Sequence, residues 1–138
     1  MPKFNKVQDS GKRQDFFTGS VRDTNDGKPR YDLITPIGLY YLAMHYANGA
    51  KKYGDRNWEK GQHLSRYIES LERHVQKMKV GLEDEDHVSA IAWNAMAFIH
   101  TKTMIESGQL PKELNDLPDY PENVKQMLLG DKNELQDS

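Results

Sequence analysis

Hydrophobic residues recur at helical spacing in two long stretches of the chain. Between residues 64 and 81 they step by four, three, four and three positions, at Leu64, Ile68, Leu71, Val75 and Met78. This spacing predicts an amphipathic helix with a narrow apolar seam, closed by a glycine at position 81. From about 84 to 107 the sequence is apolar on nearly every side, which predicts a central helix.

Two further helices are indicated by their end signals. Thr35 and Pro36 form an N-cap followed by proline at the first helical position, which predicts a helix over about 36–50. A short helix over about 121–129, ended by Gly130, is expected after a proline-rich stretch. The sequence shows no alternation typical of strands, so all the predicted elements are helical.

The chain divides into three predicted parts. An N-terminal arm (1–26) precedes a helical catalytic domain (27–107), and a C-terminal extension (108–138) carries the short helix. The arm is rich in Lys, Asp, Gly, Ser and Asn, which favours loops and partial disorder. Its apolar cluster, Phe16 with Phe17, is available to pack on a partner subunit.

The bulk composition narrows the class of protein. With 138 residues, 36% of them hydrophobic and 29% charged, the chain fits one domain with a modest core. A net charge of −2 gives no basic field, so nucleic acid is not expected as a partner. The absence of cysteine excludes a disulfide scaffold, a thiolate zinc site and a cysteine nucleophile.

The distribution of apolar residues also bears on location and assembly. Neither an apolar N-terminal segment nor a run of membrane-spanning length is present, so we expect a cytoplasmic protein without a membrane partner. The chain has few apolar residues, yet one helix is apolar on all sides. A homo-oligomer can bury that helix more fully than a single chain can. The pattern leaves dimer and tetramer open.

Two pairs of carboxylates stand at i, i+3 spacing, Glu69 with Glu72 and Glu83 with Asp86. The first pair flanks the apolar seam and the second opens the central helix, so one short turn is expected to bring them together. Four converging carboxylates need cations to stay ionised, and such oxygen ligands suit Mg²⁺ or Mn²⁺. An interpretation without metal stays open for each pair. The first pair can lie on a solvated helix face beside nearby cations, and the second can complement the dipole at the start of the central helix.

The loop after the first helix combines cations, an amide and large aromatic rings. Lys51, Lys52, Asn57 and Trp58 suit a nucleotide, with phosphate at one end and a stacked base at the other. Asn94, inside the central helix, is either a backbone-bonded core amide or a group that faces a ligand. Both interpretations of Asn94 stay open.

Other residues and missing motifs restrict the site further. His74 and His87 are expected to pack or form hydrogen bonds rather than bind metal, and Trp93 is expected in the core. The sequence has no Walker loop, no Gly-x-Gly-x-x-Gly, no Glu-x-x-His repeat, no His-Asp dipeptide and no Gly-x-Ser-x-Gly elbow. These absences exclude P-loop, dinucleotide-binding, di-iron, HD-type and α/β-hydrolase sites.

Several segments together resemble a known family. The matching segments are Glu69-x-x-Glu72, Glu83-x-x-Asp86, residues 28–34 (KPRYDLI), 49–54 (GAKKYG), Asn57-Trp58, Gly61, 71–74 (LERH) and 84–94. Over about residues 27–105 the chain resembles the phage dATP/dGTP diphosphohydrolases, a subgroup of the MazG-like nucleotide pyrophosphohydrolases. Some members of that subgroup supply purine monophosphate for making 2-aminoadenine-containing phage DNA.

The resemblance implies an all-α, MazG-like bundle of antiparallel helices whose core a second subunit completes. It also implies hydrolysis of a purine dNTP, dGTP before dATP, to dNMP and pyrophosphate. Glu69, Glu72 and Asp86 are then the expected catalytic residues. Together with Glu83, or Glu85 in its place, they are the expected ligands of two or more Mg²⁺ or Mn²⁺ ions.

The other expected site residues bind the substrate. The phosphates are assigned to Arg73, Lys51 and Lys52. The sugar, or alternatively a metal-bound oxygen, is assigned to Asn94, and the base to Asn57 with Trp58. The sequence does not rank guanine against adenine or ribose against deoxyribose. Two other functions stay open: a nucleotide-binding regulator without turnover, and a helical interaction module whose acids face solvent.

Overall fold

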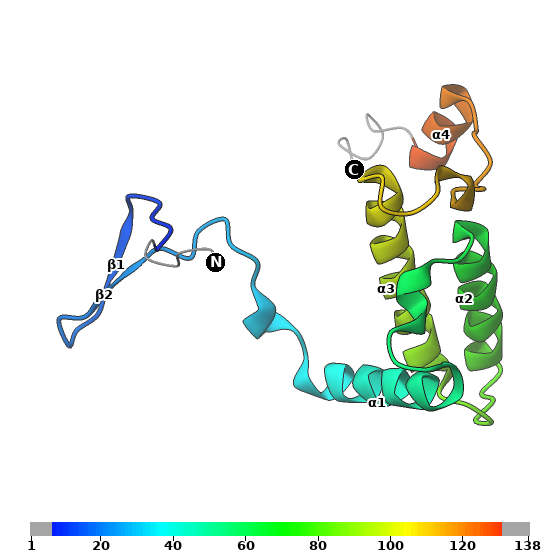
Figure 1. Cartoon of the computed structure of the whole chain (residues 1–138), viewed down its shortest axis with the longest axis horizontal. Helices are drawn as coiled ribbons and strands as arrows, with labels where there is room; N and C mark the ends of the chain where they lie inside the picture. The colour runs from blue at the N-terminus through cyan, green and yellow to red at the C-terminus, as the bar shows by residue number, and fades with distance from the viewer. Residues whose placement is uncertain (1–6, 131–138) are drawn as a thin grey trace. The chain divides into compact units, whose positions relative to one another are not determined.

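The computed structural model of the chain describes residues 7–130. The outer ends of the predicted arm and extension, 1–6 and 131–138, lie outside the described residues. The chain forms two compact units that divide between Thr35 and Pro36, later than the predicted boundary at 26/27. Figure 1 shows the elements of both units in chain order.

The first unit contains a small β-hairpin that the sequence pattern did not predict. β1 (Arg13–Asp15) pairs antiparallel with β2 (Val21–Asp23), and a 3-10 helix, η1 (Tyr31–Leu33), follows. The prediction of helices alone was wrong here, because strands of three residues are too short to show an alternating pattern. Polar contacts support the hairpin, among them the bond from the Ser10 hydroxyl to the Asp23 carboxylate.

The turn of the hairpin carries Phe16 and Phe17, and both rings are exposed. The Phe16 amide donates to Ser20 O and the Gly19 amide donates to Phe16 O, each at 2.9 Å. Gly19 takes a φ of +89°, a left-handed conformation that glycine adopts without strain. Exposed rings on a tight turn agree with the predicted contact to a partner subunit, which stays a prediction.

The second unit is helical, as predicted. Its helices are α1 (Pro36–Tyr53), α2 (Leu64–Lys79), α3 (His87–Glu106) and α4 (Glu122–Leu129), with the 3-10 helices η2 (Asn57–Lys60) and η3 (Lys112–Leu114) between them. All four predicted helices are present, although α1 continues past residue 50. The all-α fold class is confirmed, since the short hairpin is the only sheet within residues 7–130.

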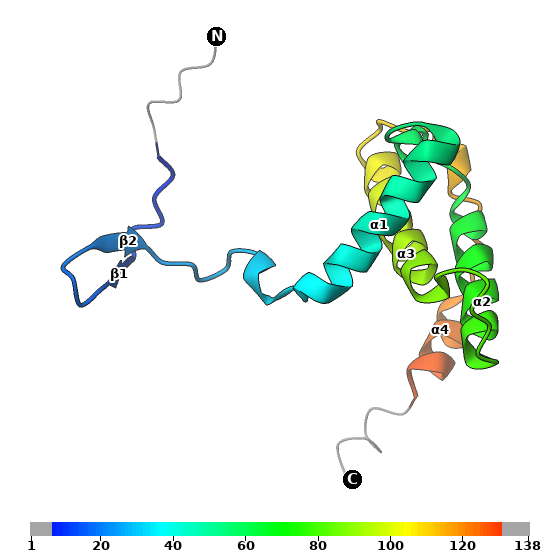
Figure 2. The same ribbon diagram turned by 90° about the horizontal axis from the view of Figure 1, so that it is seen from below.

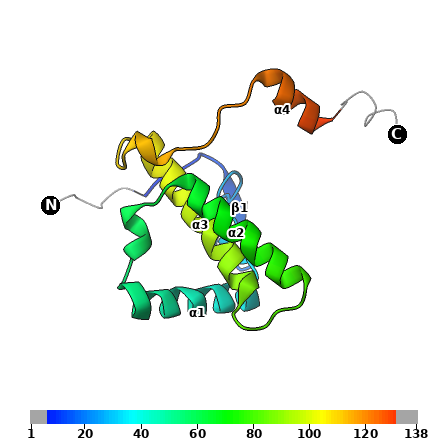
Figure 3. The ribbon, with the colours of Figure 1, turned by 90° about the vertical axis from the view of Figure 1, so that its right-hand side faces the viewer.

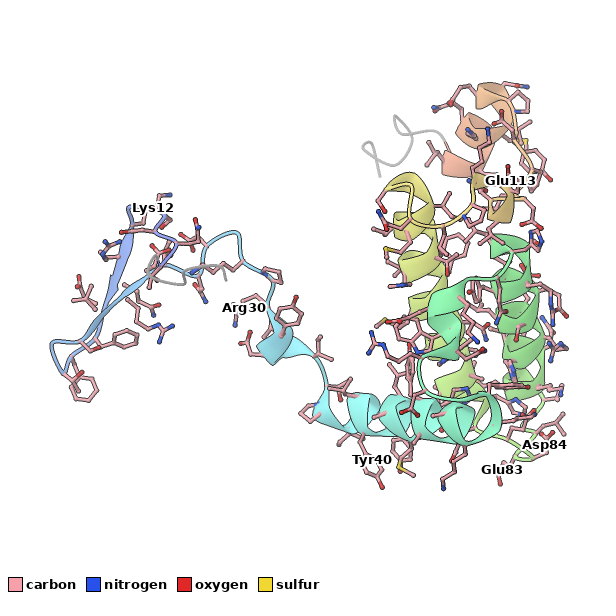
Figure 4. All side chains as sticks on the ribbon, viewed as in Figure 1. Lys12, Arg30, Tyr40, Glu83, Asp84 and Glu113 are labelled. Carbon is pink, nitrogen blue, oxygen red and sulfur yellow. The ribbon has the colours of Figure 1, made fainter. Side chains whose placement is uncertain are left out.

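The start of α3 corrects one prediction that concerns the site. Glu83 was expected on this helix, but α3 begins at His87, with Asp86 as its N-cap. The Asp86 carboxylate accepts hydrogen bonds from the Ser89 amide at 3.0 Å and from the Ser89 hydroxyl at 2.5 Å. Glu83 therefore lies in the α2–α3 turn, where Figure 4 shows it beside Asp84.

The N-terminus of α2 is capped from a distant part of the chain. Its own N-cap residue, His63, makes no side-chain cap bond. Instead the Asp116 carboxylate accepts from the Ser65 amide at 3.0 Å and from the Ser65 hydroxyl at 2.5 Å. The segment between η3 and α4 is thereby tied to α2.

α2 and α3 lie side by side and antiparallel, joined by the turn at residues 80–86 (Figures 1 and 3). α1 crosses the N-terminal half of α3, where the rings of His45 and Trp93 are 6.4 Å apart (Figure 2). After α1 the chain returns to α3 through η2, with Trp58 edge-on to His100 at 4.9 Å. The space bounded by α1, η2 and the helix pair holds the cleft described below.

The core between α2 and α3 is small. Leu64 and Tyr67 are buried, and the hydroxyls of Tyr67 and Thr101 share a hydrogen bond of 3.1 Å. The buried side chains of α2 are those of Leu64, Tyr67 and His74, and their centre is turned by about 50° from the predicted seam. Both rings find polar partners on α3, whereas Met78, at the end of the predicted seam, is 42% exposed.

Many apolar side chains of the second unit are exposed in the single chain. Every residue of α1 is at least partly exposed, and Ile37, Tyr40, Val88 and Ile99 are each more than half exposed. Exposed apolar surface on this scale agrees with the expectation of a homo-oligomer, which stays a proposal. None of the helices within residues 7–130 is both long and apolar enough to cross a membrane.

Candidate functional site

Three helices and their connections enclose a polar cleft of about 450 Å³. α2 contributes Arg66, Ser70 and His74 to its wall, and α3 contributes Trp93 and Asn94. The other lining residues are His45, Gly49, Tyr53, Asn57, Gln62, Glu85 and Ala90. A cleft that presents a guanidinium, a carboxylate, amides and imidazoles together is suited to a charged polar ligand.

An aromatic hollow of about 510 Å³ adjoins the polar cleft. Trp58 lies edge-on to Tyr46 with 6.1 Å between ring centroids, and the Arg56 guanidinium lies 5.3 Å from the Trp58 ring centroid. Four residues line both cavities: Gly49, Tyr53, Asn57 and Trp93. The shared lining makes the two cavities neighbours, and we call them together the recess, with an aromatic part and a polar part.

Two buried histidines meet across the helix pair at the polar end. The Nδ1 atoms of His74 and His87 are 2.9 Å apart, and His87 Nε2 lies 2.8 Å from Asp84 Oδ1. Ligand atoms of His74, Glu85 and His87 all lie within 4.8 Å of one another. We name these three residues the histidine group. The predicted hydrogen bonding of both rings is confirmed, and their spacing also admits a metal ion.

The ionisation states of this region follow from burial and hydrogen bonding. Desolvation lowers the pKa of His74 below its usual value, so this ring is neutral at neutral pH. The hydrogen bond from His87 lowers the pKa of Asp84 and keeps its carboxylate ionised. An ionised carboxylate can only accept, so His87 Nε2 carries a proton. One further proton then lies between the two Nδ1 atoms.

The predicted acidic ligands do not assemble in the same way. Among residues 7–130, the histidine group is the only set of three or more His, Asp or Glu side chains that meets the 4.8 Å spacing. Glu69, Glu72, Glu83 and Asp86 form no such set, and their role as metal ligands stays a prediction. Of the two alternatives in the acidic run, it is Glu85 that belongs to the group and lines the polar cleft.

Glu69 and Glu72 lie on the exposed side of α2. Glu69 Oε1 accepts from Arg73 Nε at 3.1 Å, and Glu69 also pairs with Arg66. The hydrogen bond from Arg73 is the main cause that lowers the pKa of Glu69, and the charge of Arg66 adds to it. Pairing with nearby cations is one of the ordinary interpretations that the sequence left open.

Asp86 and Glu83 also have local settings. The hydroxyl and then the amide of Ser89 lower the pKa of Asp86, and both carboxylate oxygens take part in this cap. Glu83 lines a shallow depression of about 290 Å³ around the α2–α3 turn, together with Glu85 and His87. Asp86 therefore stabilises the start of α3 whether or not it also binds an ion.

The predicted substrate-binding residues separate into two sets. Asn57 and Asn94 line the polar cleft, and Trp58 lines the aromatic hollow. The three predicted phosphate-binding cations, Lys51, Lys52 and Arg73, line neither cavity. Both interpretations of Asn94 have support, because its Nδ2 donates to Ala90 O at 2.8 Å and to Ser70 Oγ at 3.3 Å while the residue also faces the cleft.

Sequence reasoning missed Arg66 and Ser70 as cleft residues and gave His74 only a structural role. A signal for them exists, since Arg66, Ser70 and His74 recur every four residues and so form one stripe on α2. This stripe borders the buried face on the flank opposite Glu69 and Glu72. The spacing of Glu69 and Glu72 predicted a site on their flank of α2, whereas the polar cleft lies along the flank of Arg66, Ser70 and His74.

The fold and the recess define an all-α protein with an aromatic hollow beside a polar cleft and a cluster of metal-type ligands. The chain belongs to the dATP/dGTP diphosphohydrolase family: residues 18–109 match its N-terminal domain, described as "dATP/dGTP diphosphohydrolase, N-terminal". No curated protein and no solved structure matches the chain significantly. The family name indicates a hydrolase of purine deoxynucleotide metabolism.

Proposed function

We propose that the chain hydrolyses a purine dNTP, dGTP before dATP, to the monophosphate and pyrophosphate. A water molecule attacks the α-phosphorus in line, and a new P–O bond forms to the water oxygen. The bond from the α-phosphorus to the α–β bridging oxygen breaks, so that pyrophosphate leaves with that oxygen. The proton lost by the water passes to a neighbouring carboxylate or to solvent.

The recess, an aromatic hollow beside a polar cleft within the family-matched residues, is the observation that carries this proposal. A ligand that fills both the aromatic hollow and the polar cleft needs an aromatic end and a charged end. A nucleotide has both, in its base and its phosphates. We assign the purine to the hollow beside Trp58 and Tyr53, with Asn57 at the junction. The phosphates then lie in the cleft beside Arg66.

The cleft side chains have distinct proposed roles. The Arg66 guanidinium can hold two phosphate oxygens at once, in exchange for its present partner Glu69. Asn94 uses its donor Nδ2 for its two bonds within the protein, and its acceptor Oδ1 takes part in neither. We assign Oδ1 to a sugar hydroxyl. The exposed cations Lys51, Lys52 and Arg73 remain candidates for the outer phosphates.

The proposed activity depends on divalent ions, and the donors of this chain fit them. When bound, Mg²⁺ or Mn²⁺, in two or more ions, lowers the pKa of a water molecule and neutralises charge on the leaving pyrophosphate. Two candidate ligand sets exist: the histidine group, and the four predicted carboxylates Glu69, Glu72, Glu83 and Asp86. Glu69 and Asp86 are already engaged with Arg73 and Ser89, and the four carboxylates form no close set. The donor atoms of the histidine group do lie close together, and their imidazoles suit Mn²⁺ better than Mg²⁺.

The test is hydrolysis of each dNTP by the purified chain with Mg²⁺, in water labelled with oxygen-18. Monophosphate carrying the label, together with unlabelled pyrophosphate, is the expected result. Nucleoside and triphosphate as products would place the chain in another class of hydrolase. Binding of dGTP without turnover would favour a regulator, and neither binding nor turnover would favour an interaction module.

The setting of the activity is part of the same proposal. Exposed apolar residues on α1 and α3 support a homo-oligomer, either dimer or tetramer. The resemblance to phage proteins supports a role in remodelling the purine dNTP pool in the cytoplasm of an infected cell. Light scattering of the purified chain measures the assembly, and a monomer at micromolar concentration would contradict it.

A further inference from the structure

The two buried histidines and the turn beside them share features with a transition-metal site. We propose that His74, Glu85 and His87 bind one divalent transition-metal ion such as Mn²⁺, Co²⁺ or Zn²⁺, with Asp84 holding His87 in place. This site goes beyond the Mg²⁺ that accompanies a nucleotide. Metal binding here does not require the proposed hydrolysis, although its use in catalysis would rest on it.

The spacing of the two rings fits a shared ion. Their centroids are 5.2 Å apart, and their Nδ1 atoms are 2.9 Å apart. With metal–nitrogen distances of about 2.0–2.1 Å and a tetrahedral angle, two ligand nitrogens stand about 3.3 Å apart. Small pivots of the two rings about their present positions are enough to reach this separation.

Asp84 supplies the outer contact that metal-binding histidines commonly have. Such a histidine donates its second ring N–H to a carboxylate or carbonyl, which fixes the ring and its tautomer. His87 Nε2 lies 2.8 Å from Asp84 Oδ1, and only 3% of the His87 residue is exposed. Because Nε2 carries this proton, the lone pair of His87 is on Nδ1, which is turned toward His74.

Without metal, one proton lies between the two Nδ1 atoms. An ion that binds both nitrogens takes the place of that proton, which moves to His74 Nε2 so that the ring stays neutral. Glu85 then adds a negative oxygen ligand from the turn. The exchange costs one hydrogen bond and creates two metal–nitrogen bonds and one metal–oxygen bond.

The ligand types decide which ions fit. Imidazole nitrogens suit Zn²⁺, Co²⁺ and similar ions, whereas Mg²⁺ prefers a shell of oxygen atoms and keeps several waters. A set of two imidazoles and one carboxylate therefore favours a transition metal over Mg²⁺. The group lies on the wall of the polar cleft, since His74 and Glu85 both line it. An open coordination position there is accessible to a ligand in the cleft.

The experiment is a titration of the metal-free full-length chain with Co²⁺, followed by its visible absorption. The wild type is expected to develop a saturable absorption band from nitrogen and oxygen ligands, which millimolar Mg²⁺ does not remove. Glu85→Gln should weaken Co²⁺ binding by roughly tenfold or more, and Asp84→Asn by roughly 10–100-fold. The matched control Glu113→Gln changes an exposed carboxylate that belongs to no candidate ligand set and should stay within about twofold of the wild type.

Replacement of the buried rings completes the test. His74→Gln and His87→Gln should abolish the band, with circular dichroism showing that each variant is folded. Glu85→Gln is exposed and keeps the test decisive even if a buried variant fails to fold. A wild type without a Co²⁺ band, a band that Mg²⁺ displaces, or equal losses in Glu113→Gln and Glu85→Gln would each overturn the proposal.

The outcome for this site is independent of the outcome for the proposed function. Hydrolysis of dGTP in Mg²⁺ by a chain that binds no Co²⁺ would remove the histidine site and keep the enzyme. Co²⁺ binding that depends on Glu85 in a chain that hydrolyses no dNTP would keep the histidine site and remove the enzyme.

Discussion

The two flanks of α2 carry ionisable side chains in opposite settings. On the outer flank, Glu69 and Arg73 form an ion pair in water, and Glu72 is exposed beside them. On the inner flank, His74 is 8% exposed and reaches His87 across the helix pair. The outer charges are satisfied by solvent and by each other. The inner groups have only a few partners, so an entering ion or substrate changes their energies far more.

The largest effect that tests this comparison is on catalysis by carboxylate variants. We expect Glu85→Gln to lower kcat/KM for dGTP by roughly 100-fold, about 2.7 kcal/mol of transition-state stabilisation. Glu72→Gln, on the outer flank, is expected to lower it by only a few-fold. Gln keeps the shape of the side chain and removes the charge, so the two variants compare position alone. Steady-state kinetics in Mg²⁺ provides the measurement.

The reverse order would change the assignment of the site. Loss of activity in Glu72→Gln with an active Glu85→Gln would restore the four predicted carboxylates as the metal ligands. Glu113→Gln is the control, because Glu113 is exposed and lies outside both candidate ligand sets and both cavities. Its kcat/KM should match that of the wild type.

The next effect concerns Asn94, which belongs both to the inner face and to the cleft. Asn94→Ala removes the bonds to Ala90 O and Ser70 Oγ, and we expect it to lower the free energy of unfolding by about 1 kcal/mol. It should also lower kcat/KM by roughly tenfold, about 1.4 kcal/mol, if Oδ1 holds the sugar. Asn48→Ala, at an exposed position of α1, is the control for both quantities. A destabilised Asn94→Ala with wild-type kcat/KM would contradict the sugar contact.

The helices and one stripe of α3 could be predicted from the sequence. Proline and glycine end signals and 3.6-residue periodicity are local, so they identified all four α-helices among the described residues of the second unit, but not the 3-10 helices η2 and η3. The spacing of His87, Asn94 and Thr101 also places them on one stripe of α3, and all three are buried. A repeating pattern of polar residues on an otherwise apolar helix is enough to find such a stripe.

The direction that α2 faces could not be predicted in the same way. Its seam of aliphatic residues pointed to one face, but the observed face is turned toward Tyr67 and His74. The turn depends on partners in α3, Thr101 and His87, which lie far along the chain. A spacing motif such as Glu69-x-x-Glu72 shows which residues share a flank, but not whether that flank faces the partner helix. The Asp86 cap, which removes Glu83 from α3, is likewise visible only in the folded chain.

A smaller expected effect compares the two flanks of α2 by the free energy of unfolding alone. Tyr67→Phe leaves the buried Thr101 hydroxyl without its partner, so we expect the free energy of unfolding to fall by about 1 kcal/mol. Glu69→Gln breaks exposed ion pairs and should change stability by less than the error of a denaturant melt. Tyr120→Phe, at a half-exposed tyrosine, is the control for loss of a hydroxyl. Equal losses at Tyr67 and Glu69 would contradict the difference between the flanks.

The smallest expected effect lies at the start of α2, where Asp116 caps the helix. The Ser65 hydroxyl and then the Ser65 amide lower the pKa of Asp116 below its usual value. A carboxylate with a lowered pKa stabilises the folded state above its unfolded pKa of about 3.9, and this contribution is lost as the pH falls through the folded value.

At pH 7, the Asp116→Ala variant should therefore melt a few degrees below the wild type, which is roughly the effect of one lost cap. Toward pH 3 and below, the two melting temperatures should converge, because the wild-type carboxylate becomes protonated. His63→Gln is the matched control, since His63 Nδ1 lies 3.7 Å from Asp116 Oδ2 but forms no cap bond to α2. A difference in melting temperature that stays constant from pH 7 to pH 2 would mean that Asp116 acts through packing rather than through its charge.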